Sequence, residues 1–230
     1  MTRDFSITTR LGSLLLLLFA ASCAAEDTMH DAHGDLFDSR GCIPIADTPS
    51  GSIGCFVVAK KELGALPPAP LYWHIDKFAN ARTAGGAAAP SSQIVEAFGQ
   101  TWLMTIAAQN WRPAVKGERV AEIGPLPVGS AQTYAATYME ATFMPDTRTR
   151  VHIHPGPEAW YMLEGSQCLE TPEGRTIVGP GKTMMVRGDI PMVLHAYGSE
   201  RRRSLVLILH DAARPASTPN NWTPKWLCRD

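Results

Sequence analysis

From residue 130 onward, short apolar stretches alternate with tight-turn sequences at close intervals. The stretches 134–144, 183–189 and 204–211 predict strands, because they are short and bounded by turn residues. The turn sequences are Pro145–Asp146, Pro155–Gly156–Pro157, Glu173–Gly174, Gly179–Pro180–Gly181 and Gly198–Ser199. Short strands with regular turns are typical of a β-sandwich or barrel. We therefore expect a mainly β barrel over residues 129–213 and a C-terminal tail, 214–230, packed on it.

The first half of the chain is mixed in character. Its strand-like segments are residues 53–60, 71–78, 93–99 and 100–107. Residues 79–92, rich in Ala and Gly, predict either a short helix or a loop. We expect a small α+β region over 53–128, preceded by a flexible polar tether over 26–52. The sequence leaves open whether 53–128 is a separate domain or an extension of the barrel.

Residues 1–25 have the parts of a secretory signal. Arg3 and Arg10 form a basic N-terminal part. An apolar run follows that is too short to span a bilayer comfortably, and it ends in small residues and Cys23. This resembles a bacterial lipoprotein signal with Cys23 lipidated, although Ala20 stands where such signals usually carry Leu. Ordinary cleavage near Ala24 therefore stays open. We expect an exported protein, periplasmic or an outer-membrane lipoprotein, that meets the membrane through its lipid anchor only.

The net charge bears on which macromolecules the protein can bind, and the number of cysteines bears on the compartment in which it folds. Lys and Arg number 21 and Asp and Glu 22, a net charge of -1, so no basic field favours nucleic acid. Apart from Cys23, an even number of cysteines in an oxidising compartment predicts two disulfides. Of the three connectivities, we favour Cys42–Cys55, a local loop, and Cys168–Cys228, which would tie down the tail.

The segment HIHPGPEAWYMLEG, residues 152–165, holds the residues best suited to chemistry. His152 and His154 are two apart, so on a strand both side chains point to one face. A turn of proline and glycine follows and can bring Glu158 to the same face from the adjacent strand. Two imidazoles and one carboxylate form a facial ligand set for a divalent transition metal.

The same segment resembles the first motif of the cupin superfamily: His-x-His, three or four residues, Glu, six residues, Gly. His152, His154, Glu158 and Gly165 fill these positions, whereas the Gly that usually lies six residues before the first His is Asp146 here. The resemblance covers roughly residues 130–212. It implies a cupin-type double-sheet jelly-roll barrel, here preceded by the small α+β region.

The second cupin motif usually supplies one more His. The simplest alignment places Met192 there, and His195 lies three residues further on. On an uninterrupted strand these two side chains point to opposite faces, so His195 becomes a metal ligand only if a bulge re-aims it. His210 is another candidate. The remaining alternative is a metal held by His152, His154 and Glu158 alone, with its other positions open to water or substrate.

The resemblance leaves two functions open. One is a metal-dependent enzyme of dioxygenase, isomerase or lyase type, using Fe, Mn, Zn or Ni on a small oxygenated substrate. The other is a non-catalytic envelope module that binds a small ligand or has a structural role. Similar cupins often dimerise, so a homodimer is also open. Arg201–Arg203 predict a solvated hairpin tip, with an anion clamp as the alternative.

Overall fold

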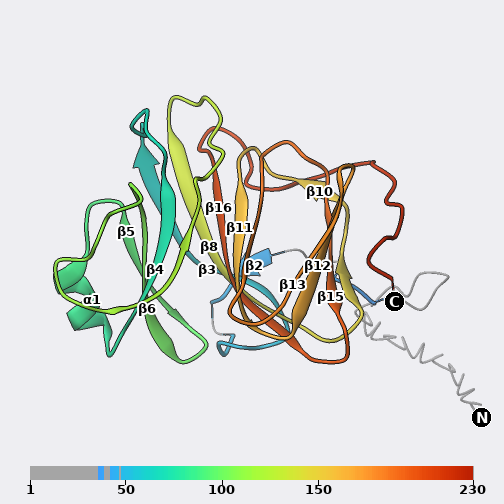
Figure 1. Cartoon of the computed structure of the whole chain (residues 1–230), viewed down its shortest axis with the longest axis horizontal. Coiled ribbons are helices and arrows are strands. Elements are labelled where there is room, and N and C mark those ends of the chain that lie inside the picture. Colours follow the sequence, from blue (N-terminus) through green and yellow to red (C-terminus); the bar gives the residue numbers. More distant parts are fainter. Residues whose placement is uncertain (1–35, 39–41, 47, 230) are drawn as a thin grey trace, which may run out of the picture.

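The computed structural model describes residues 36–38, 42–46 and 48–229 of the 230-residue chain. Within these residues the strands form three larger sheets and one small pair, and the only helix is α1 (Ala81–Ala87). The mainly β class predicted from the sequence is confirmed. Figure 1 shows the three sheets side by side as layers.

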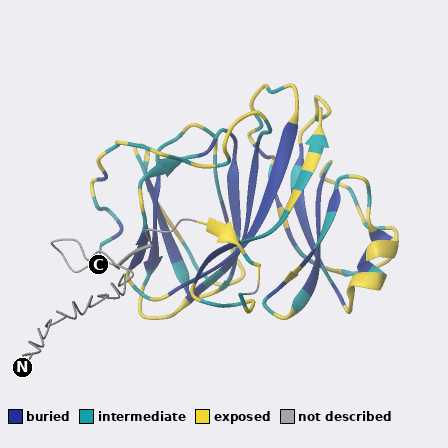
Figure 2. Ribbon diagram, turned by 180° about the vertical axis from the view of Figure 1, so that it is seen from behind, coloured by how far each residue is buried: buried dark blue, intermediate teal, exposed yellow. Residues whose placement is uncertain are grey.

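The middle layer is a mixed sheet that the other two layers cover. Its order is β14 (Thr183–Val186), β11 (Glu158–Glu164), β16 (Arg202–Asp211), β8 (Tyr134–Phe143), β3 (Gly54–Gly64) and β2 (Cys42–Pro44). Strands β8 and β16 pair antiparallel from Tyr134 opposite Asp211 to Phe143 opposite Arg202. Every residue of β8 is buried (Figure 2), which requires cover on both faces of the sheet.

One face of the middle layer packs against a second sheet, and the two sheets together form the barrel. The facing sheet has the order β1 (Leu36–Asp38), β9 (Thr147–Thr149), β15 (Val193–Tyr197), β12 (Ser166–Thr171) and β13 (Gly174–Val178). The small pair joins β10 (His152–Ile153) to β17 (Thr218–Pro219). Trp160 and Val206 of the middle layer share one core with Leu169 and Leu194 of the facing sheet. The double-sheet jelly-roll barrel predicted from the sequence is confirmed.

The other face of the middle layer packs against an outer sheet. This sheet has the order β5 (Ser92–Ala97), β6 (Gln100–Ala107), β4 (Tyr72–Phe78) and β7 (Glu118–Ile123). Trp73 and Met104 of the outer sheet lie in one core with Tyr138, Leu205 and Leu207 of the middle layer. Both sheets thus bury apolar side chains against each other, and the outer sheet is the left-hand layer in Figure 1.

Alternation along β16 divides its side chains between the two cores. Val206 and Ile208 belong to the barrel core, whereas Leu205, Leu207 and Leu209 belong to the core shared with the outer sheet. Successive side chains of a strand point to opposite faces, so a continuous apolar run is what a strand between two cores requires.

Part of the predicted 53–128 region belongs to the barrel sheet. Strand β3 pairs antiparallel with β8 over its length, with irregularities near Ala59 and Gly64, whereas β4 to β7 form the outer sheet. The division at residue 128 stays a prediction. The predicted signal over 1–25 and most of the tether lie outside the described residues. Within the described part of the chain, no helix is long and apolar enough to cross a membrane.

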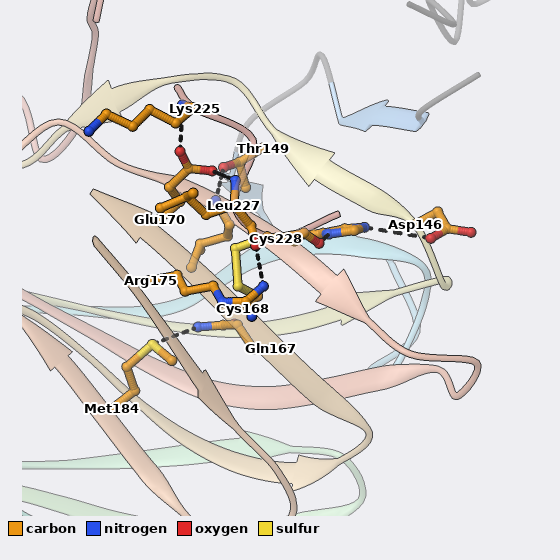
Figure 3. The surroundings of a disulfide bond; sticks show 12 residues. Asp146, Thr149, Gln167, Cys168, Glu170, Arg175, Met184, Lys225, Leu227 and Cys228 are labelled. Carbon is orange, nitrogen blue, oxygen red and sulfur yellow. Dashed lines mark hydrogen bonds and ion pairs between the residues drawn. A yellow bond between two sulfur atoms is a disulfide. The ribbon is translucent and has the colours of Figure 1, made fainter. Parts of the chain in front are cut away.

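Both predicted disulfides are confirmed. Cys42–Cys55 links β2 to β3, and Cys168–Cys228 links β12 to the C-terminal tail (Figure 3). Disulfides of this kind are typical of oxidising compartments.

Candidate metal centre

The chain from β10 to β11 brings the three predicted ligands together. His152 begins β10, Glu158 begins β11, and His154 lies in the connection between them. Gly156 makes this tight connection feasible, because a Cβ there would lie 2.0 Å from the carbonyl oxygen of Leu209 on β16. Only glycine allows the turn to approach the neighbouring strand this closely.

The ligand atoms of these residues converge. One nitrogen from each of His152 and His154 and a carboxylate oxygen of Glu158 all lie within 4.8 Å of one another. His154 and Glu158 are both buried, and His152 is partly exposed. A nitrogen–nitrogen–oxygen set of this kind is the arrangement expected of a facial site for a divalent transition metal.

Backbone carbonyls fix which nitrogen of each ring faces the site. His152 Nδ1 donates to the carbonyl of Arg150 at 2.7 Å, and His154 Nδ1 donates to the carbonyl of Ala216 at 2.6 Å. With Nδ1 carrying the proton, Nε2 of each neutral ring presents a lone pair. Orientation of a ligating histidine by a hydrogen bond at its second nitrogen is usual in metal sites.

Two buried atoms of the group have no hydrogen-bond partner among the described residues. These are His154 Nε2 and Glu158 Oε2. They approach to 2.9 Å, without the alignment of a hydrogen bond. Buried polar atoms are costly when they are left without a partner. A divalent metal would satisfy both atoms at once, so the residues present fit the ion that the motif implies.

The two histidines have opposite pKa shifts. Burial, together with the positive charge that His154 can carry, lowers the pKa of His152. Burial also opposes the charged form of His154, but the Glu158 carboxylate and the carbonyl of Ala216 outweigh it and raise the pKa of His154. Glu158 therefore favours a positive charge beside it, which either a proton or a metal ion can supply.

The C-terminal tail forms one wall of this centre. Strand β17 pairs with β10, placing Pro219 opposite His152, and the carbonyl of Ala216 orients His154. Farther along, the buried Glu170 carboxylate accepts the backbone N–H groups of Lys225 at 2.6 Å and Leu227 at 2.8 Å, next to the disulfide Cys168–Cys228 (Figure 3). No sequence signal pointed to the tail as a support for a ligand.

The structure does not bring His195 into the group. It lies on β15 between Leu194 and Ala196, which face the barrel core, so its own side chain faces the other way. Its Nδ1 donates to the carbonyl of Cys228 at 2.6 Å. No bulge re-aims it, and we leave it out of the ligand set proposed below.

The other two positions weighed from the sequence have different roles. Met192, at the aligned position of the second motif, exchanges both backbone hydrogen bonds with His152 and packs in the barrel core. His210 is hydrogen-bonded to Thr137, with its ring nitrogen 3.3 Å from the hydroxyl, and is not a member of the group. Asp146 has a φ of 66°, so it adopts the left-handed conformation that the usual Gly would adopt.

A cavity of about 450 Å³ opens beside the candidate ligands. Its wall includes apolar side chains of the middle layer, among them Met139, Phe143 and Trp160. Arg202 also lines it, and this residue was predicted to lie in a solvated hairpin tip; the structure buries it instead. A cavity of this size suits a small organic molecule.

Comparison with known proteins finds similarity only among solved structures. No protein-family model matches the sequence, and no curated protein sequence is similar to it. The similar solved structures include a cupin superfamily protein from Desulfitobacterium hafniense, 16% identical over 33% of this chain and 68% of that one, with a TM-score of 0.31.

Two further structures match comparable shares of this chain. A cupin-like protein from Thermotoga maritima is 13% identical over 41% of this chain and 84% of that one, with a TM-score of 0.35. A DMSP lyase from Ruegeria pomeroyi is 18% identical over 36% of this chain and 42% of that one, with a TM-score of 0.33. The chain thus spans less than half the length of some proteins that it matches. Such similarities concern the fold alone.

Proposed function

We propose that the cupin-like barrel binds a divalent transition metal through Nε2 of His152, Nε2 of His154 and the Glu158 carboxylate. The metal would serve an enzymatic reaction on a small oxygenated molecule held in the adjacent cavity. The observation that carries this proposal is the pair of buried atoms His154 Nε2 and Glu158 Oε2, which lie 2.9 Å apart without a hydrogen bond, beside a third candidate ligand. The donor set admits Fe, Mn, Zn or Ni.

In this proposal the metal, the backbone carbonyls and the cavity wall have different roles. The bound metal would polarise an oxygen of the substrate as a Lewis acid. The carbonyls of Arg150 and Ala216 hold the imidazoles in the orientation that leaves Nε2 free. The apolar side chains in the cavity wall would lower the local dielectric constant, which strengthens electrostatic interactions beside them.

Metal analysis tests the binding half of the proposal. The full chain is purified without chelator or His tag, beside the variant His152→Ala/His154→Ala and the control His210→Ala. We expect roughly one equivalent of one transition metal in the wild type and the control, and a loss of it in the double variant. Metal-free wild-type protein after reconstitution, or equal metal in the double variant, would contradict the proposal.

Turnover tests the enzymatic half. A screen of small oxygenated compounds with metal-loaded protein should find a conversion that disappears in folded His154→Ala. A compound that binds in the cavity and is never converted would instead support the non-catalytic envelope module.

We further propose that the protein is exported and anchored through Cys23. The sequence of residues 1–25 and the two disulfides support this proposal. Mass spectrometry of the N-terminal peptide should find a lipid on Cys23 and no residue before it. An unprocessed N-terminus in a cytosolic fraction would contradict it.

A further inference from the structure

Three consecutive arginines at the start of β16 have unequal surroundings. Arg201 and Arg203 both pair with Glu164, at 3.3 and 3.1 Å, near the surface. Arg202 points the opposite way, into the barrel, and is only 1% exposed. Strand alternation thus turns the middle member of a basic run into a buried cation.

The buried guanidinium has few partners. Its Nη2 donates to the hydroxyl of Ser204 at 2.9 Å, and its central carbon lies 5.0 Å from the centre of the Phe143 ring. Nε and Nη1 have no hydrogen-bond partner among the described residues. Burial lowers the pKa of Arg202 to about 9, and Glu158 opposes this shift, so the side chain stays charged at neutral pH. A buried cation normally has a paired anion.

The charges along the cavity wall favour an anionic ligand. Among the lining residues the cations are Lys60, Arg150 and Arg202, and Glu158 is the only carboxylate. A metal held by Glu158 would use that negative charge and add two positive ones. The cavity would then hold a cationic excess, from the metal and from Arg202, which an anionic ligand would offset.

We propose that Arg202 is an anion-binding subsite and that the ligand of this cavity is a small organic carboxylate. Nε and Nη1 each have an N–H group that can donate to an anionic oxygen. Inorganic phosphate has no carbon skeleton to pack against the apolar wall of Met139, Phe143 and Trp160, whereas an organic acid has one. The other end of the ligand would face the metal, and this part of the inference rests on the proposed function.

Calorimetric titration of the metal-loaded full chain tests the subsite. The probes are oxalate, malonate, succinate and glutarate, the diamide of each, and inorganic phosphate. We expect at least one of the acids to bind and its diamide to bind at least about tenfold more weakly, because hydrogen bonds to charged groups are lost. Arg202→Met should weaken binding of that acid by at least about tenfold. The control Arg201→Met also loses one guanidinium, near the surface, and should bind as the wild type does.

Arg202→Lys keeps the positive charge but lacks the planar guanidinium. It serves as the second variant if Arg202→Met fails to fold. It should bind the acid more weakly than the wild type while still preferring it to the diamide. The inference is overturned if no acid binds, if diamides bind equally well, if phosphate binds more tightly than every acid, or if folded Arg202 variants bind unchanged.

The metal-free variant His152→Ala/His154→Ala separates this inference from the proposed function. Binding of an acid that still depends on Arg202 in that variant would support the anion subsite even if no metal binds to the wild type. A wild type that holds metal and binds acids independently of Arg202 would overturn the subsite and leave the metal proposal standing.

Discussion

Removal of the disulfide Cys168–Cys228 should weaken both the fold and the metal site. This bridge closes a separation of 60 residues, for which chain entropy gives about 4 kcal/mol of stabilisation. It also anchors the tail whose Ala216 carbonyl orients His154. Loss of a partner that orients a metal ligand typically lowers metal affinity by about 10- to 100-fold.

The bridge Cys42–Cys55 provides a matched control. It closes a separation of 13 residues, worth about 3 kcal/mol, and links β2 to β3 without connecting to the tail. The double alanine variants of the two bridges should therefore lose similar stability. Only the Cys168/Cys228 variant should lose metal affinity as well.

Two assays separate these effects. Guanidinium unfolding of chelator-treated protein gives the free energy of unfolding, and competition with a chromophoric chelator for Zn(II) gives the metal affinity. Equal zinc affinity in both variants would refute the idea that the tail supports the site. A loss of less than about 1 kcal/mol without the longer bridge would refute the entropic magnitude.

Three further perturbations have defined outcomes. Glu170→Gln should cost about 1.5–3 kcal/mol and make the tail more sensitive to protease, because a buried carboxylate that accepts two backbone N–H groups loses its charge. Gly156→Ala should cost more than about 2 kcal/mol and abolish metal binding, because the added Cβ meets the Leu209 backbone. Burial and Arg119 hold the pKa of His74 below 6.5, so the free energy of unfolding should fall as pH falls below that value, and His74→Asn should flatten this dependence.

Each of these has a measurement that could contradict it. Unchanged proteolysis of the Glu170 variant would mean that other contacts hold the tail. Gly179→Ala is the control for Gly156→Ala, because a Cβ added at Gly179 would lie 3.5 Å from its nearest neighbouring atom. It should leave zinc affinity unchanged. An equal loss of zinc affinity in this control would show that any Gly-to-Ala change weakens binding. For His74, the sign follows because the unfolded chain takes up a proton at a pH where the folded chain does not; an identical slope in His74→Asn would assign the pH dependence to other groups.

Local patterns in the sequence were sufficient to predict the barrel and the convergence of the three candidate ligands. The strands of the second half could be predicted because turns of Pro and Gly bound them, and His152, His154 and Glu158 lie close together in the chain. The two disulfides were predicted from cysteine parity and from the expected export. These features depend on neighbours in sequence, so periodicity and spacing reveal them.

Long-range packing decided what the sequence did not reveal. The apolar run of β16 predicts a buried strand but does not show that alternate side chains face two different cores. The three-layer arrangement could therefore not be predicted. The burial of Arg202 depends on which face of β16 lines the barrel. The support of His154 by Ala216 depends on a tail more than sixty residues away in sequence, held by a bridge and by Glu170.

Anomalous diffraction from crystals of the metal-loaded protein tests the central claim most directly. Data collected on both sides of the absorption edge of the metal locate the ion independently of any assumption about its ligands. We predict one peak bonded, at about 2.0–2.2 Å, to Nε2 of His152, Nε2 of His154 and an oxygen of Glu158. A peak at other residues, or no peak in crystals soaked with each of the four candidate metals, would contradict the account.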